Sequence, residues 1–447
     1  MESFARLSQL PAGLLADVPA EPLPQSLAGW ISALPEEVLT IVSKVAESGH
    51  GVWVVGGPVR DGLSGRIPND FDLTSTMEPE QVIDLFPDSI PTGVEYGTVT
   101  VRTEPGGAHF EMTTLRSDQE YLDGRRPESV KFGKSLNDDL QRRDLTINSM
   151  AIDLARCLLH DPFEGRLDLG KGVLRAVGEA KVRLAEDGLR IMRVYRFMDQ
   201  SEAGLWQPDE ELSAALIESQ TMLQNVSVER IWQEFTRILE GEHAADVLSR
   251  LAVDGVLERL LPSGNMELRP QSELSGVENP VEARLAILFH PASARDDLIA
   301  LKAPKKVIVG VEDLLSRLGQ LPNPAEPGEL RLYRAALGAR LQLQLACESA
   351  LDEPSEAAVS TALDALAVNR AGNSPLADGN WIVEQTGLSP GIRLGRLKAW
   401  LHHLQAENDL ATLSEVAERL AQLSWQDGEP ESWPRLQWPP ADTPADE

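Results

Sequence analysis

The sequence predicts an α+β protein in which a mixed N-terminal part is followed by an all-helical remainder. Residues 51–57, GVWVVGG, are typical of a buried strand that ends in a tight turn before a helix. Two β-rich runs flank the turn EPGG within residues 98–115, which indicates a hairpin. From about residue 169 onward, strand signals fade and apolar residues recur with helical spacing.

The elements can be placed in order along the chain. Residues 1–34 are rich in proline and lack a long periodic stretch, so we expect the fold to begin at Pro35. The segment that follows is predicted to be helical because its apolar residues share one helix face: Val38, Leu39, Val42 and Val45. After the paired glycines, Pro58 suits the first turn of a second helix.

The helical part contains two long periodic segments, LAEDGLRIMRVYRFM (184–198) and VERIWQEFTRILEG (228–241), each expected as one helix. The end of the chain is acidic and rich in proline, and we expect a poorly packed tail whose tryptophans dock on the body. These signals divide the chain into an N-terminal extension (1–35), a mixed α/β part (36–168), two helical parts (169–265 and 266–424) and the acidic tail (425–447).

Composition excludes several classes of protein. The 447 residues carry 41 Lys+Arg against 70 Asp+Glu, a formal charge of -29, so bulk charge cannot hold this chain on nucleic acid. Any polyanionic partner must meet a local basic surface. No run of about 18 apolar residues occurs, so we expect no membrane span. With only Cys157 and Cys347 and no secretion signal at the N-terminus, a cytoplasmic protein is expected; its oligomeric state stays open.

Two carboxylates alternate with apolar residues in NDFDLT (69–74). On a strand, Asp70 and Asp72 would face one side and lie about 6.6 Å apart at their Cα atoms, while Phe71 and Leu73 would face the core. Oxygen-rich side chains at that spacing can converge on hard cations. In so acidic a chain such a pair is weak evidence by itself, since a solvated strand edge has the same pattern.

Neighbouring segments add context to this pair. Backbone amides at Gly56 and Gly57 can meet phosphate oxygens at a helix start, with Arg60 one turn further on. Glu111 alternates with apolar neighbours on the predicted hairpin and could supply a third carboxylate. A strand-to-helix turn that needs positive φ, and a surface acid, are the alternative interpretations of these residues.

The residues from 56 to 75, GGPVRDGLSGRIPNDFDLTS, closely resemble the nucleotide-binding motif of class II tRNA nucleotidyltransferases and bacterial poly(A) polymerases. Five further segments resemble that family's motifs in the family's order: FEMTTLRSDQEYLDGRRPESVKF (110–132), DLQRRDLTINSMAID (139–153), HDPFEGRLDL (160–169), LAEDGLRIMRVYRF (184–197) and NVSVERIWQEFTRIL (225–239). The resemblance covers about the N-terminal half of the chain. It implies that residues 36–168 form a nucleotidyltransferase head like that of DNA polymerase β, followed by a neck, body and tail.

The resemblance also implies an activity. Family members transfer CMP and AMP from CTP and ATP to the 3′ end of tRNA without a nucleic-acid template and release pyrophosphate. Phosphoryl transfer needs charge neutralisation and in-line positioning, which two Mg²⁺ ions supply. By resemblance, Asp70 and Asp72 would bridge the metals, and Glu111 would bind the ion that activates the attacking hydroxyl.

Further residues would hold the nucleotide. The resemblance assigns the triphosphate to Gly56, Gly57, Arg60 and Arg143, and places Asp144 and Asn148 near the ribose. Asp187 and Arg190, three apart on one predicted helix, offer an acceptor beside a fork of donors and can pair with a base edge. Arg193 and Arg196 continue that stripe and contact the nucleotide by resemblance; helix-stabilising ion pairs are the alternative. Residues 171–196 carry seven basic and three acidic residues, so we expect a locally basic neck.

Several related functions stay open. Full CCA addition is favoured because the loop SDQEYLDGRRPESVKF (117–132) is present, although enzymes that add only the terminal A also keep this loop. Poly(A) polymerase is less favoured because the basic-aromatic stretch usual after the third strand is absent. A non-catalytic RNA-binding protein would show a lost carboxylate or a broken glycine turn, and a metal-dependent phosphohydrolase would show His-Asp pairs beyond residue 265; the sequence shows neither.

Overall fold

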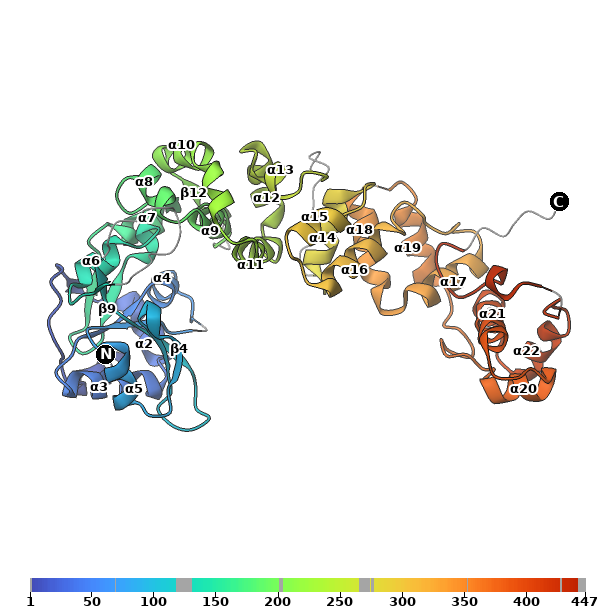
Figure 1. Cartoon of the computed structure of the whole chain (residues 1–447), viewed down its shortest axis with the longest axis horizontal. Helices are drawn as coiled ribbons and strands as arrows, with labels where there is room; N and C mark the ends of the chain where they lie inside the picture. The colour runs from blue at the N-terminus through green and yellow to red at the C-terminus, as the bar shows by residue number, and fades with distance from the viewer. Residues whose placement is uncertain are drawn as a thin grey trace. The chain divides into compact units, whose positions relative to one another are not determined.

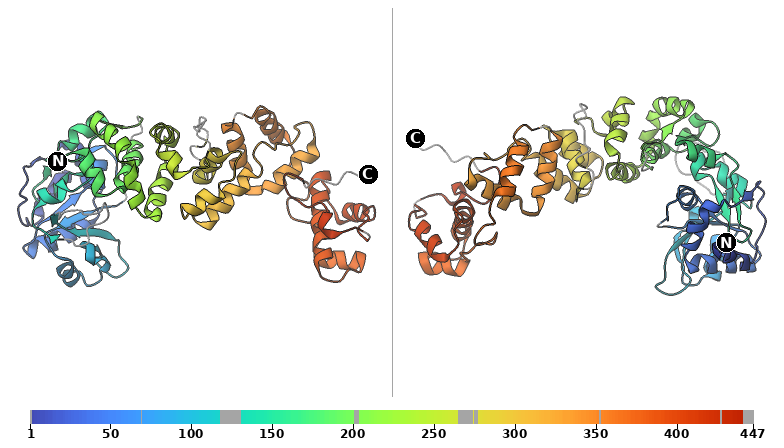
Figure 2. Two further views of the ribbon diagram at one scale, coloured as in Figure 1. Left: turned by 45° about the horizontal axis from the view of Figure 1, so that its top comes forward. Right: turned by 180° about the vertical axis from the view of Figure 1, so that it is seen from behind.

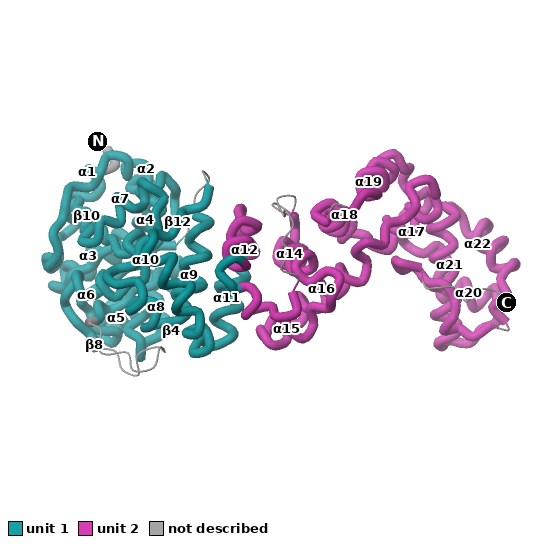
Figure 3. The backbone as a smooth tube through the Cα atoms, turned by 90° about the horizontal axis from the view of Figure 1, so that it is seen from above, with its two compact units in different colours: residues 1–238, 253–256 teal, residues 239–252, 257–447 magenta. Residues whose placement is uncertain are grey.

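The computed structural model divides the chain into two compact units. The first comprises residues 1–238 with 253–256, and the second comprises residues 239–252 with 257–447 (Figure 3). The structure describes residues 2–68, 70–117, 131–200, 204–264, 274, 277–351, 353–426 and 428–440. The predicted boundary near residue 265 lies outside the described residues, and the division into five parts stays a prediction.

The first unit contains an eight-stranded mixed sheet in the order β1-β10-β9-β2-β3-β6-β5-β4. Its strands are β1 (Glu21–Pro22), β2 (Val52–Val55), β3 (Leu73–Ser75), β4 (Ile90–Gly93), β5 (Thr98–Val101), β6 (Phe110–Thr114), β9 (Ala151–Asp153) and β10 (Leu158–His160). Strands β3 and β6 pair in parallel, and β5 and β6 form the predicted hairpin. The predicted strand, turn and helix are also confirmed, since β2 leads into α4 (Gly57–Leu63) with Pro58 in its first turn.

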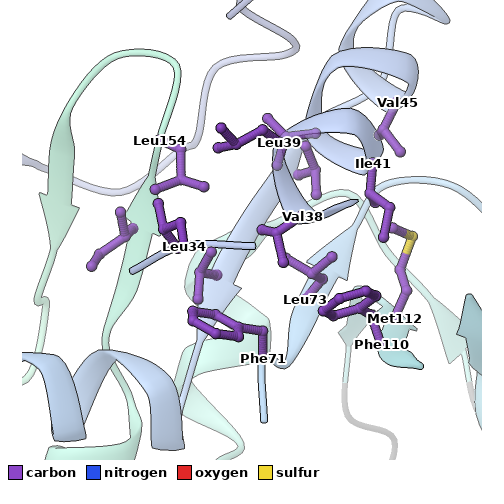
Figure 4. Packing of buried hydrophobic residues seen from close by; sticks show 14 of the residues in the cluster. Leu34, Val38, Leu39, Ile41, Val45, Phe71, Leu73, Phe110, Met112 and Leu154 are labelled. Carbon is purple, nitrogen blue, oxygen red and sulfur yellow. The ribbon is translucent and has the colours of Figure 1, made fainter. Parts of the chain in front are cut away.

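The core of this unit lies between the sheet and α3 (Glu36–Glu47), the helix predicted after Pro35. Figure 4 shows Val38 and Ile41 of α3 directed toward Leu73 and Met112 of the sheet. Phe71 and Leu73 are buried, whereas Asp70 is exposed and Asp72 is half-buried, as alternation predicts. The strand itself begins only at Leu73, so the expectation that both aspartates lie on it is wrong: they lie on the segment that leads into β3.

The expectation that the fold begins at Pro35 is also wrong. The earlier residues form α1 (Glu2–Ala5), η1 (Leu7–Gln9), β1, η2 (Gln25–Leu27) and α2 (Ala28–Ser32). Leu7, Leu27 and Ile31 are fully buried in the core cluster that contains the α3 residues. These apolar residues are too sparse to form a periodic pattern, yet each one fills the core, and Pro22 is tolerated because β1 is an edge strand.

Helices cover the rest of the first unit. They include α6 (Leu136–Gln141), α7 (Gly165–Lys171), α8 (Ala180–Glu186), α9 (Leu189–Met198), α10 (Glu210–Glu218) and α11 (Val228–Leu239). Residues 184–198 are not the single helix that their periodicity predicts, because the backbone at Asp187 is extended between α8 and α9. A Cβ at Gly188 would meet the Met222 carbonyl oxygen at 2.4 Å, so a distant segment fixes this break.

The second unit is helical in its described residues, which confirms the α+β class (Figures 1 and 2). Its longer helices are α12 (Ala244–Val253), α14 (Pro280–Phe289), α16 (Lys305–Leu315), α17 (Pro327–Leu337), α18 (Leu341–Ala350), α19 (Glu356–Ala365), α20 (Gly379–Thr386), α21 (Ile392–Asn408) and α22 (Leu413–Leu420). Trp433 and Trp438 are buried in two of its cores, so the tryptophans dock as predicted. Residues 428–440 are therefore not the poorly packed tail expected, and residues 441–447 lie outside the described part. No described helix is long and apolar enough to cross a membrane.

Candidate active site

A cavity of about 610 Å³ in the first unit collects most of the predicted site residues. Its walls come from the glycine turn, the segment before β3, the residues after α6, and helices α9 and α11. The predicted residues that line it are Gly56, Gly57, Arg60, Asp70, Asp72, Arg143, Asp144, Asn148, Asp187, Arg190, Arg193 and Arg196. Glu111 lies outside this cavity and lines a smaller neighbouring one.

The glycine turn is shaped to admit an arginine. Gly56 has φ 71°, a conformation that L side chains rarely adopt, and its N–H donates to the Met150 carbonyl at 3.3 Å. A Cβ at Gly56 would lie 3.0 Å from Nη1 of Arg143. Glycine at this position therefore serves both the turn and the close approach of the Arg143 guanidinium.

A chain of buried hydrogen bonds joins three elements behind the cavity. Nη1 of Arg60 in α4 donates to Oδ1 of Asn148 at 2.8 Å, and Nδ2 of Asn148 donates to Oδ1 of Asp144 at 3.1 Å. Nε of Arg193 in α9 donates to the other oxygen of Asp144 at 2.7 Å. Burial alone would raise the pKa of Asp144, but the charge of Arg193 and the Asn148 hydrogen bond hold it well below its usual range. Asp144 is thus a fixed anion that orients arginines around the cavity.

The paired arginines follow directly after α6. Asp139 is fully buried and accepts from Nε of Arg142 at 2.9 Å and from Nη2 of Arg143 at 3.2 Å. Burial would raise the pKa of Asp139, yet the charges of the two arginines lower it overall. Both guanidinium groups line the cavity from this shared anchor.

The prediction that Asp187 and Arg190 are neighbours on the face of one helix is wrong. Asp187 lies in the break between α8 and α9, where its carboxylate accepts from the Leu189 amide at 3.0 Å and from Nη2 of Arg230 at 2.7 Å. Arg190 instead forms an ion pair with Glu186 and donates to the Arg142 carbonyl at 2.8 Å. Both residues still line the cavity, because the break turns the Asp187 side chain toward it.

One aromatic ring gathers three guanidinium groups. The guanidinium carbons of Arg60, Arg193 and Arg196 lie 5.1, 5.3 and 4.2 Å from the centroid of the Phe197 ring. Such cation–π contacts hold planar cations in place without neutralising them. Arg196 also donates to Glu234 in α11 at 2.5 Å.

The surplus of positive charge counted in the neck is partly neutralised. Acids outside residues 171–196 pair with its basic side chains: Asp168 and Asp209 with Arg175, Glu218 with Lys181, Asp144 with Arg193, and Glu234 with Arg196. The count over residues 171–196 leaves these partners out, since Asp168 lies just before that segment and the others lie further away along the chain. The neck is therefore less basic than its own residues alone indicate.

Two of the three predicted carboxylates, Asp70 and Asp72, line this cavity, and the third, Glu111, lines its smaller neighbour. The smaller cavity of about 230 Å³ is lined by Asp72 and Glu111 together with Arg142 and Arg143, so Asp72 and the paired arginines are shared by the two spaces. Burial and the nearby charge of Glu111 raise the pKa of Asp72, with a further contribution from Asp70; Arg143 and Arg60 oppose the shift. Within the described ranges, no three acidic, His or Cys side chains already converge as a formed metal site. The donor set nevertheless fits a hard cation, because close carboxylates that repel one another are stabilised by added positive charge.

Sequence reasoning missed several residues that line the cavity: Asp61, Arg142, Phe197, Arg230 and Arg237. Arg142 and Arg230 stand within motifs that the sequence does reveal, one beside Arg143 and the other in the last neck motif. Phe197 gives a weaker signal, as an aromatic residue directly after a stripe of arginines. The loop on which the choice of full CCA addition depends lies mostly outside the described residues, which omit 118–130.

Two known families match consecutive parts of the chain. The Poly A polymerase head domain matches residues 52–175. A family described as a probable RNA and SrmB-binding site of polymerase A matches residues 207–268.

Curated relatives match over most of their length. The CCA-adding enzyme of Geobacillus thermodenitrificans is 35% identical over 327 residues, which cover 72% of this chain and 80% of that enzyme. The CCA-adding enzyme of Lactobacillus delbrueckii subsp. bulgaricus is 32% identical over 375 residues, covering 81% and 91% respectively.

Solved structures also match. The Bacillus stearothermophilus CCA-adding enzyme in complex with CTP has a TM-score of 0.68 at 27% identity, covering 87% of this chain and 98% of the other. The Thermotoga maritima CCA-adding enzyme complexed with tRNA has a TM-score of 0.64 at 20% identity, covering 91% and 99%; this match concerns the fold alone.

Proposed function

The chain belongs to the family of class II CCA-adding enzymes and poly(A) polymerases, and on this premise we propose that it adds CMP, CMP and AMP to the 3′ end of tRNA from CTP and ATP, with release of pyrophosphate. The observation that carries the proposal is one cavity lined by a glycine turn, two aspartates and several arginines. Phosphoryl transfer needs charge neutralisation and positioning more than covalent help. The two sides of this cavity supply both.

The triphosphate would bind between the glycine turn and the arginines. Arg142 and Arg143 are held by Asp139, and Arg60 is held by Asn148, so these guanidinium groups reach the cavity in fixed orientations. A guanidinium offers paired N–H donors that match phosphate oxygens. Because their anchors exist before substrate arrives, little reorganisation is needed when the nucleotide binds.

The carboxylate side would hold Mg²⁺. Asp70 and Asp72 are the proposed ligands, with Glu111 as a third, and the raised pKa of Asp72 supports a site that gains from a cation. When bound, Mg²⁺ supplies positive charge to the triphosphate and to the attacking 3′ hydroxyl. The chain itself positions Asp70 and Asp72 by burying the intervening Phe71 in the core.

Base selection is assigned to Asp187 and Arg190. Their present partners, Arg230 and Glu186, keep one acceptor and one donor group oriented at the cavity wall. A base edge would compete for the same hydrogen-bonding atoms, and a pyrimidine or purine that fits both would be retained. Asp144 and Asn148 would lie near the ribose, behind the triphosphate arginines.

The test uses the full-length protein with Mg²⁺, labelled CTP or ATP, and three tRNAs that end before CCA, after CC, or with complete CCA. We expect C and then A to be added to the first tRNA, only A to the second and nothing to the third. Addition of A but never C would identify an A-adding enzyme, and continued addition of A to complete tRNA would identify a poly(A) polymerase.

A matched pair of variants separates catalysis from binding alone. Asp70→Asn should abolish transfer in the same assay, whereas Glu104→Gln removes an exposed acid from the hairpin turn and should leave transfer unchanged. tRNA binding without any transfer by the unsubstituted protein would instead favour a non-catalytic RNA-binding protein on this fold.

A further inference from the structure

The residues before Pro35 pack behind two walls of the cavity, although they precede the matched head domain, which begins at residue 52. We define the N-terminal wrap as residues 7–34. Its residues do not line the cavity. Two of them, Asp17 and Trp30, contact the elements that carry the cavity's functional side chains.

Asp17 contacts the start of α6. Its Oδ1 accepts from the backbone amides of Leu136 at 2.8 Å and Asn137 at 3.2 Å, and the Ser135 hydroxyl accepts from the third amide at 3.0 Å. The first amides of a helix have no partner within the helix, so these acceptors complete it. Helix α6 has only six residues and ends directly before Arg142. Its start is therefore separated from the triphosphate arginines by less than two helical turns.

The wrap holds Asp17 firmly at that place. The next residue, Val18, is buried in a cluster with Leu136 and Leu140 of α6. The Val18 carbonyl lies 3.2 Å from Nδ1 of His160, and the Gly13 carbonyl accepts from Arg156 at 2.6 Å. Burial opposes ionisation of Asp17, but the hydrogen bonds from the Ser135 side chain and the backbone amides together lower its pKa, so the capping group is a carboxylate.

Trp30 contacts the other wall. The Trp30 side chain is buried against α4, where a Cβ added to Gly62 would meet its Cδ1 atom at 2.7 Å. Its ring also lies 6.0 Å from the ring of Phe71, the residue between Asp70 and Asp72. Trp30 thus lies behind both the helix that carries Arg60 and the segment that carries the two aspartates.

We propose that the N-terminal wrap is a positioning element of the active site, in which Asp17 sets the triphosphate arginines through α6 and Trp30 sets the catalytic carboxylates through Phe71. This inference rests on the proposed nucleotidyl transfer. Neither residue touches substrate, so each acts through the element it contacts. The two contacts predict different kinetic defects, because Asp17 supports the nucleotide-binding arginines alone, whereas Trp30 also supports the reacting carboxylates.

The first experiment measures KM and kcat for CTP and ATP with full-length Asp17→Ala. Loss of the cap should raise both KM values about fivefold and change kcat much less. Asp17→Asn keeps an oxygen acceptor at the same place and should restore most of the affinity. Glu21→Ala is the matched control, because it removes another carboxylate of the wrap whose partner, Arg166, lies outside the cavity.

The second experiment uses Trp30→Leu, which should lower kcat about tenfold or more, since misplaced carboxylates slow the reaction. KM should rise as well, because Trp30 also packs on the helix that carries Arg60. Hydrogen exchange at the Leu136 and Asn137 amides should accelerate in Asp17→Ala and stay unchanged in Trp30→Leu. This readout also keeps the test decisive if one variant folds poorly.

The outcomes separate the two hypotheses. Unchanged KM in Asp17→Ala, an equal effect of Glu21→Ala, or losses that only follow the unfolded fraction would each overturn the positioning role. An unsubstituted protein that transfers no nucleotide would overturn the proposed function instead. In that case, equilibrium CTP binding tests the positioning role of the wrap without transfer. Binding about fivefold weaker in Asp17→Ala would support this role, and equal binding would contradict it.

Discussion

The two sides of the cavity treat their carboxylates in opposite ways. In its arginine-lined part, Asp144 and Asp187 each accept hydrogen bonds from an arginine. On the side formed by the sheet, Asp72 has a raised pKa because burial and the charge of Glu111 outweigh Arg143. The carboxylates of the arginine-lined part are thus already paired with positive charge, whereas Asp72 on the sheet side is stabilised when positive charge is added.

This contrast explains how so acidic a chain can handle a polyanion. The arginines of this cavity are a small set, and several of them are oriented by buried acids such as Asp139 and Asp144. A triphosphate with its cation fits between such a side and a carboxylate side, since each part of the ligand meets the opposite charge. The predictions below test this contrast from the largest expected effect to the smallest.

Asp72→Asn should have the largest effect on transfer. It removes the proposed metal ligand while keeping the shape of the side chain, and we expect kcat to fall at least about 1000-fold. The melting temperature should stay the same or rise, because the carboxylate lost is one that burial destabilises. Rapid-quench transfer assays and thermal melts measure the two effects. Near-normal transfer would contradict the role given to the sheet side.

Asp144→Ala should show the reverse pattern for stability. It leaves Arg193 and Asn148 without their shared acceptor, and we expect the free energy of unfolding to fall by about 2 kcal/mol. Urea denaturation measures the change, with exposed Asp88→Ala as a control. If the two substitutions destabilise equally, the anchoring role of Asp144 is wrong.

The pH dependence should also differ between the two sides. Since the folded-state pKa of Asp72 is raised, its contribution to stability is present at low pH and is lost as the pH rises through that value. The lowered pKa of Asp144 has the opposite sign: its contribution is present above the unfolded pKa and is lost as the pH falls through the folded one. Transfer should therefore gain rate as Asp72 ionises, and more Mg²⁺ should move this rise to lower pH. If the pH at which the transfer rate rises does not depend on the Mg²⁺ concentration, metal binding at Asp72 is contradicted.

Arg237→Ala should have the smallest effect. Its side chain is 59% exposed and lies 3.5 Å from Glu234, and exposed pairs of this kind contribute less than about 0.5 kcal/mol to stability. Since it lines the cavity, nucleotide KM is the more sensitive measurement. A large loss of stability would contradict the small contribution expected of this exposed ion pair.

The sequence predicts the features that depend on neighbouring residues. The strand before Gly56, the turn and the β5–β6 hairpin follow from local patterns, and the motif residues identify most of the cavity lining. The break at Asp187 escapes prediction because the Met222 carbonyl that crowds Gly188 is 34 positions away. The partners of the neck arginines and the burial of Leu7 and Trp30 are missed for the same reason: each depends on contacts that only the folded chain creates.

The contact of Trp30 with Gly62 has a consequence for recombining this enzyme with its relatives. In a hybrid joined at residue 52, where the family match begins, the residue at position 30 and the α4 glycine at position 62 would come from different proteins. Any side chain at position 62 would collide with the indole, and a smaller residue at position 30 would leave a void behind the aspartates. Exchanges that transfer both positions together should yield active hybrids, whereas exchanges that separate them should not.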